Sequence, residues 1–204
     1  MEFLFTEESI LSQNFQGLYA DKLSCDVIVR VKDKEFQVHK AVLIARSKVF
    51  AAMFHHETTE KNSGIVTISD CDAYSFHHFL EYLYCGKLGG LSFRHAFDLY
   101  ETSEKYDVLE LKIFCREQLI ENFTVEKFCE VVLLAEKYND ASLMSSIEYF
   151  FHENAGEIIQ TPDWEYLIQT SPSSTTKLMA KFKEMTEEKI NKSTERCKYL
   201  LATT

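Results

Sequence analysis

Alternating apolar and polar residues in the first third of the chain predict a small β-sheet. Valines at every second position of residues 26–31 give a strand with one apolar face. A polar turn at residues 32–34 leads into a second alternating segment, residues 35–39, and the two segments predict a β-hairpin. Residues 65–68 form a third short apolar segment. We therefore expect the strands to lie before residue 70.

The rest of the chain has apolar residues every three or four positions, which is the spacing of amphipathic helices. Residues 9–18 carry Leu11, Phe15 and Leu18 on one face, and a helix this short is stable only when that face is docked. Residues 41–54 have apolar positions on two adjacent lines, which predicts one buried central helix. Further helices are expected over residues 75–85, 93–106, 109–122, 124–138, 142–159 and 162–169, followed by a last helix.

A weak internal repeat organises the helical part of the chain. The segment Glu104-Lys105-Tyr106 recurs as Glu136-Lys137-Tyr138, which predicts two helix-turn-helix units. Thr124 is the expected N-cap at the start of the second unit. Two copies are too few for a solenoid, so each pair must stack on the preceding domain. We expect one domain over residues 1–122 and a helical region over residues 123–204.

Composition and charge restrict the classes of partner. The chain of 204 residues has ordinary globular composition, with 46% hydrophobic and 26% charged residues. Its 22 basic and 32 acidic residues give a formal net charge of -10, which repels phosphate backbones and anionic lipids. We therefore expect no binding to nucleic acid and none to membranes.

Targeting signals and disulfides are not expected. The longest stretch without a charged residue, residues 9–20, is too short to span a bilayer. Residues 1–8 lack the basic segment of a secretory signal, so we expect the nucleus or cytoplasm as the location. Six cysteines are spread singly along the chain and are expected to be free thiols.

No residue pattern predicts catalysis or a cofactor. The chain has no P-loop, GxGxxG, GxSxG or HExxH motif. The histidine pairs at residues 55–56 and 77–78 point about 100° apart on a helix, so neither pair can chelate a metal. We expect no catalytic residues, metal or cofactor, and a protein that binds proteins. The alternative of an enzyme with an unrecognised Cys/His site stays open.

Several segments resemble the signature of BTB/POZ domains. They are Asp26-Val27-Ile28-Val29, residues 35–43 with the sequence EFQVHKAVL, residues 45–54, and Tyr82-Leu83-Tyr84-Cys85-Gly86. The likeness is closest to the speckle-type POZ protein group, and we expect this chain to lack the MATH domain of that group. The resemblance implies an α+β fold class. A BTB/POZ fold, a small mixed sheet flanked by helices, would be followed by an all-α, shortened BACK-like helical extension.

The same resemblance implies a function and a set of partners. Speckle-type proteins are homodimeric adaptors of cullin 3 RING ubiquitin ligases, so the implied partners are a second copy or a related BTB protein, and cullin 3. The alternative is a BTB oligomerisation scaffold, for example in transcriptional co-repression, that does not bind cullin. The positions that align with the family's dimer interface are Leu11, Phe15, Leu18, Asp26, Lys40 and Val42.

The implied cullin contacts are Thr58, Thr59, Glu60 and Tyr84. The first three align with a hydrophobic-x-Glu motif in which Thr58 departs from the family pattern. A hydroxyl fills an apolar pocket less well than Met or Leu, which we expect to weaken binding about tenfold. A second contact, the helical pair called the 3-box, aligns with residues 124–152.

Overall fold

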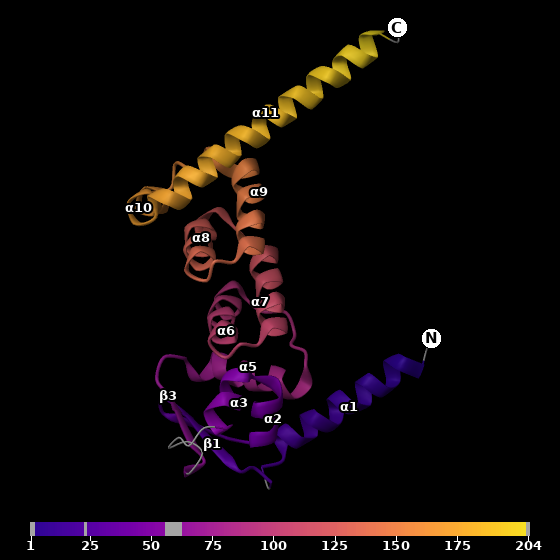
Figure 1. The fold of residues 1–204 in the computed structure, drawn as a ribbon, viewed down its shortest axis with the longest axis vertical. Coiled ribbons are helices and arrows are strands. Elements are labelled where there is room, and N and C mark those ends of the chain that lie inside the picture. Colours follow the sequence, from indigo (N-terminus) through magenta and orange to yellow (C-terminus); the bar gives the residue numbers. More distant parts are fainter. Residues whose placement is uncertain (1–2, 23, 56–62, 203–204) are drawn as a thin grey trace. The chain divides into compact units, whose positions relative to one another are not determined.

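The computed structural model describes residues 3–22, 24–55 and 63–202 (Figure 1). The chain divides into two compact units, residues 1–122 and residues 123–204. Each unit has its own set of fully buried apolar side chains. All strands of the described residues belong to the first unit.

The sheet of the first unit has three strands in the order β2-β1-β3. β1 (Val27–Val31) pairs antiparallel with β2 (Lys34–Val38) and parallel with β3 (Ile65–Ile68). Val29 lies opposite Phe36 across the hairpin, and the three valines of β1 are buried. The predicted hairpin and third strand are confirmed, because burial on one face fixes the register of an alternating strand.

The other regular elements among the described residues of the first unit are helices. They are α1 (Phe3–Ala20), α2 (Lys40–Arg46), α3 (Lys48–His55), α5 (Ala73–Cys85), α6 (Phe93–Lys105) and α7 (Leu109–Glu121). α1 packs against α5, and α6 packs against α7. Asp72 caps α5 by accepting hydrogen bonds from two backbone N–H groups, and Gly86 ends it in the left-handed conformation with φ 71°.

The single helix predicted over residues 41–54 is wrong, because the chain breaks at Ser47. This residue is extended, with φ -141° and ψ 122°, and it separates α2 from α3. Its hydroxyl donates to the carbonyl of Tyr106 at 2.6 Å and accepts from the N–H of Phe50 at 3.2 Å. Ser47 is 2% exposed, so these bonds form in the core. A serine that caps the next helix offers the backbone an alternative to continuing the first.

The second unit is entirely helical among its described residues. It consists of the 3-10 helix η1 (Val125–Lys127), α8 (Phe128–Lys137), α9 (Ala141–Ile158), α10 (Pro162–Thr170) and α11 (Pro172–Ala202). Thr124 holds the predicted N-cap position, with φ -134° and ψ 166°, but its side chain makes no capping hydrogen bond. The tight first turn explains this, because η1 replaces the first α-helical turn that a cap would serve.

An aromatic cluster forms the core of the second unit. Phe128 and Phe151 are fully buried with ring centroids 5.5 Å apart, and Trp164 stacks on Phe151 at 5.2 Å. Phe182 of α11 meets Phe151 edge-on at 5.9 Å. Leu178, one turn earlier, is 1% exposed. The first half of the long helix α11 is therefore anchored on this cluster.

The predicted internal repeat is confirmed at the two helix-helix turns. Asp107, between α6 and α7, has φ 51°, and Asn139, between α8 and α9, has φ 50°. In both turns the next residue donates its N–H to a carbonyl five residues earlier, at 2.9 Å. These are the bonds of a Schellman motif, in which Asp and Asn tolerate the left-handed position.

Candidate functional site between α1, α2 and α5

A groove of about 630 Å³ runs between α1, α2 and the C-terminal end of α5. Phe15 and Leu18 line it from α1, and Val42 lines it from α2. Phe15 is 37% exposed and Leu18 is half-buried, whereas Val42 is 7% exposed. The structure thus brings together three residues that the resemblance assigns to dimerisation. Leu11 belongs to α1, and its side chain lies outside the described residues.

Polar contacts hold α1 against α5. The hydroxyl of Ser12 donates to the carbonyl oxygen of Cys85 at 3.1 Å. The hydroxyl of Tyr19 lies 2.9 Å from Nδ1 of His77, and its ring lies 4.8 Å from the ring of Tyr84. Burial raises the pKa of Tyr19, so its hydroxyl stays protonated and donates to His77. Helix α1 therefore docks on α5, which meets the need of this short helix for a docking surface.

A buried hydrogen-bond chain forms the floor of the groove. The hydroxyl of Tyr84 accepts from the backbone N–H of His39 at 2.9 Å and lies 2.8 Å from Nδ1 of the same residue. Burial raises the pKa of Tyr84 to about 12, so the phenol keeps its proton and donates it to Nδ1. Nε2 of His39 then carries the ring proton and donates to the hydroxyl of Ser24 at 2.8 Å.

One cysteine lies beside this histidine. The sulfur of Cys25 is 3.9 Å from Nε2 and 4.0 Å from Nδ1 of His39. Burial, followed by the negative charge of Asp26, raises the pKa of the Cys25 thiol. An activated cysteine needs a lowered pKa, so this pair lacks the electrostatic arrangement of a nucleophilic Cys/His site.

The two charged residues assigned to the dimer centre lie at the start of α2. Oδ1 of Asp26 accepts from the backbone N–H of Lys40 at 2.7 Å. The ammonium of Lys40 sits over the ring of Phe54, 4.9 Å from its centroid. Neither residue lines the groove. The hydrogen bond from the Lys40 N–H to the Asp26 carboxylate positions the start of α2.

Of the residues assigned to cullin binding, Tyr84 lies within the described residues. Thr58, Thr59 and Glu60 lie outside the described residues. Tyr84 lines the groove, is 4% exposed, and has its hydroxyl bonded to His39. The assignment of Tyr84 as a cullin contact stays a prediction, and its buried side chain offers little surface to a partner.

Several groove residues were not assigned by sequence reasoning, among them His39, Arg46 and Cys85. His39 belongs to the motif of residues 35–43, so the motif could have indicated this residue. The guanidinium of Arg46 lies 5.7 Å from the ring centroid of Tyr82, a contact that no linear pattern indicates.

The sequence matches the family model of the BTB/POZ domain over residues 15–123. The chain belongs to the BTB/POZ domain family. Apart from Ser12, every groove-lining residue lies inside this BTB/POZ match. BTB/POZ domains are non-catalytic protein-interaction modules that generally self-associate. The expected fold class, an α+β BTB/POZ fold with a helical extension, is confirmed, and the BACK likeness of that extension stays a prediction.

Curated relatives of the BTB/POZ chain share about a third of its residues. Protein maternal effect lethal 26 of Caenorhabditis elegans is 30% identical over 85% of this chain and 44% of its own length. TD and POZ domain-containing protein 5 of Mus musculus is 32% identical over 80% of this chain and 48% of its own length. The chain therefore spans about half the length of these relatives.

A solved BTB/POZ structure also aligns with the chain. The BTB domain of zebrafish PATZ1 aligns with 24% identity and a TM-score of 0.46, covering 55% of this chain and 89% of its own. In the part of the chain that the structure describes, no helix combines the length and apolarity needed to cross a bilayer. The same residues contain no cluster of three side chains suited to hold a metal ion.

Proposed function

We propose that this chain is a homodimeric adaptor of a cullin 3 RING ubiquitin ligase, acting in the nucleus or cytoplasm. The observation that supports dimerisation is the groove between α1, α2 and α5. It exposes Phe15 beside Leu18 and Val42, where a polar surface would be expected on an isolated domain. In a two-fold dimer each such residue is used twice, once from each copy. Burial of a large apolar side chain contributes about 1.5–3 kcal/mol, so the doubled set can hold two copies together.

A charge placed in the groove is expected to convert the dimer into a monomer. The double variant Phe15→Glu with Leu18→Glu places two carboxylates opposite the same two carboxylates of the partner copy. Removing these like charges from water costs more free energy than the interface provides. Size-exclusion chromatography with light scattering gives the mass. Gln16→Glu is the matched control, because Gln16 is exposed on the same helix and does not line the groove. A double variant that keeps the mass of the unmodified protein contradicts the proposed interface.

Cullin recruitment is supported by membership of the BTB/POZ family and by the resemblance to the speckle-type group. The residues involved are Thr58, Thr59 and Glu60, with the helices of residues 124–152 as a second contact. Asp26 and Lys40 remain proposed contributors at the dimer centre.

Calorimetric titration with the N-terminal domain of cullin 3 tests this recruitment. We expect about one cullin domain per protomer, loss of binding in Glu60→Lys, and about tenfold tighter binding in Thr58→Met because a thioether fills an apolar pocket. Glu187→Lys makes the same charge change at an exposed position of α11 and is expected to bind normally. Absence of heat with the unmodified chain would leave the oligomerisation scaffold as the better account, whereas the mass measurement above would be unaffected.

A further inference from the structure

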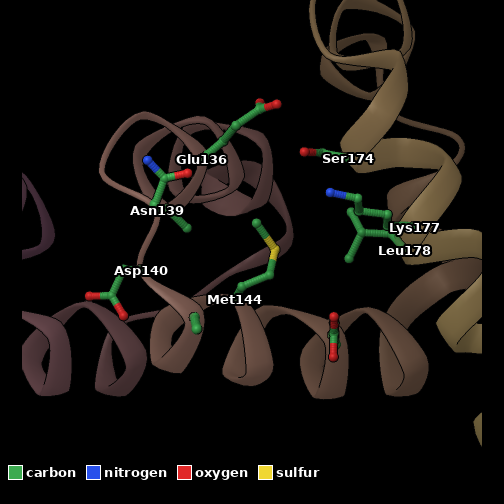
Figure 2. Close-up of a pocket in the computed structure, with 10 residues that line it drawn as sticks. Glu136, Asn139, Asp140, Met144, Ser174, Lys177 and Leu178 are labelled. Atoms are coloured by element: carbon green, nitrogen blue, oxygen red, sulfur yellow. The ribbon is translucent and has the colours of Figure 1, made fainter.

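The second unit contains a pocket of about 300 Å³ that the proposed function does not use. The end of α8, the first turns of α9 and the first turns of α11 line it, and we name it the α8–α9–α11 pocket (Figure 2). Pockets that bind small ligands measure about 300–1,000 Å³. The volume therefore suits a short segment of a few atoms in width, such as two neighbouring side chains.

Hydrogen bonds fix the walls of the α8–α9–α11 pocket. The hydroxyl of Ser171, just before α11, donates to Oε2 of Glu136 on α8 at 2.6 Å. Oδ1 of Asp140 accepts from the N–H of Leu143 at 2.9 Å, which caps α9 at the floor of the pocket. Both carboxylates are thus engaged by protein donors. The first bond ties the residue before α11 to α8, and the second fixes the start of α9.

Two donors on α11, Ser174 and Lys177, line the pocket and bond to none of its acceptors. Ser174 is 5% exposed, and its hydroxyl makes no hydrogen bond to another described residue, although its oxygen is not sealed from the pocket. Lys177 lies one turn further along the same face and forms no ion pair with any described side chain. Figure 2 shows both side chains reaching from α11 toward Asn139 and Met144 across the pocket. An acceptor that enters the pocket can form hydrogen bonds with both donors.

The turn of the internal repeat that lines the pocket holds a neutral residue. In the first turn of the repeat, the left-handed residue is Asp107, and its carboxylate pairs with Lys48 at 3.1 Å. In the second turn that position holds Asn139, a neutral amide that lines the pocket. The third carboxylate at the pocket, Glu148, interacts electrostatically with Lys181 on α11. The carboxylates at the pocket therefore interact with Ser171, the Leu143 N–H and Lys181, and none of them forms an ion pair with Lys177.

The chemistry of the lining restricts the occupant further. Three carboxylates around the pocket, those of Glu136, Asp140 and Glu148, disfavour a dianion such as phosphate, and a single carboxylate meets less repulsion. Met144 and Leu178 give the pocket an apolar side, and a methionine adapts its shape to what it packs against. An occupant with one carboxylate next to an apolar group satisfies both parts of the surface.

We propose that the α8–α9–α11 pocket binds a peptide segment of a partner protein, with an acidic side chain on Lys177 and Ser174 and a neighbouring apolar side chain on Met144 and Leu178. A peptide is the occupant that fits an interaction module, since an extended chain presents alternate side chains to such a pocket. The proposal does not rest on dimerisation or on cullin binding, because every lining residue belongs to residues 123–204.

Methyl NMR of the full chain tests the pocket. Methionine-methyl labelling reports five sites, and Met144→Leu identifies the signal of Met144. We titrate the capped peptide acetyl-Leu-Glu-Leu-amide and expect a saturable shift of that signal with a Kd of about 1 mM, as for small weak ligands. The peptides with Gln or Lys in place of Glu should bind about tenfold more weakly, because they lose a charge-assisted bond.

Variants of the two donors complete the test. Lys177→Gln and Ser174→Ala should each weaken binding of the Glu peptide about tenfold. Lys177 is exposed, so its variant keeps the fold even if Ser174→Ala does not. Lys183→Gln is the matched control, because the side chain of Lys183 on the same helix is 78% exposed and does not line the pocket. Equal binding of the Gln or Lys peptide, unchanged affinity in Lys177→Gln, or no saturable shift at tens of millimolar would overturn the proposal.

Discussion

Replacing Phe128 by alanine is expected to lower the free energy of unfolding of residues 123–204 by about 3–5 kcal/mol. Phe128 is fully buried, with its ring 5.5 Å from that of Phe151, 6.0 Å from that of Phe123 and 6.4 Å from that of Trp164. Truncation removes these contacts and leaves a cavity that four helices cannot close without moving. A loss of this size is a large part of the stability of a typical domain.

The single tryptophan of the chain measures this effect directly. Trp164 lies inside the same cluster, so its fluorescence during urea unfolding reports the second unit. Tyr149→Ala on α9 is the control, because Tyr149 is 64% exposed and its loss should change the free energy of unfolding by less than about 0.5 kcal/mol. Equal unfolding midpoints for the two variants would contradict the central role of Phe128.

Tyr106→Ala is expected to destabilise the first unit by a similar amount, about 3–5 kcal/mol. Its ring is 2% exposed and stacks on Phe50 at 4.7 Å with an interplanar angle of 4°. It also meets Phe79 at 5.2 Å and Phe76 at 6.2 Å. The side chain therefore joins α3 and α5 at one point. Its carbonyl, which the substitution keeps, continues to accept the hydroxyl of Ser47.

Hydrogen exchange measured by mass spectrometry separates this effect from any change in the second unit. Peptides covering β1 should lose protection in Tyr106→Ala, because core strands exchange through the largest openings of their unit. Leu109→Ala is the control, since Leu109 is 59% exposed on the neighbouring helix α7. Unchanged protection of β1 in Tyr106→Ala, or equal loss in the control, would show that the stacked ring is dispensable.

Periodicity was enough to predict the sheet and most helices. The valines of β1 alternate because one face is buried, and the stripe that contains Phe15 and Leu18 is visible because apolar residues recur on one face of α1. Such signals are local, because the polarity of each residue indicates whether its side of the strand or helix is buried. The repeat was readable for the same reason, because identical turns use similar residues at Asp107 and Asn139.

The missed features depend on contacts between residues far apart in the sequence. Ser47 breaks a helix because its hydroxyl reaches the carbonyl of Tyr106, and nothing near Ser47 indicates that partner. The sequence shows Tyr84 only as an aromatic residue on an apolar helix. Its hydrogen-bond partner, His39, lies 45 positions away in the sequence. The second pocket could not be predicted at all, because its donors and its apolar side come from helices whose packing no local pattern specifies.

The strand order of the sheet ties its formation to the two helices that interrupt it. β1 comes first in the sequence and lies at the centre, so its parallel partner can reach it only after the chain has passed through α2 and α3. The pairing of Ile28 with Ile65 closes that loop, and its entropic cost falls as the intervening chain becomes ordered. The bonds of Ser47 order the junction of α2 and α3. They therefore lower the entropy lost when β3 joins the sheet, although they lie in neither strand.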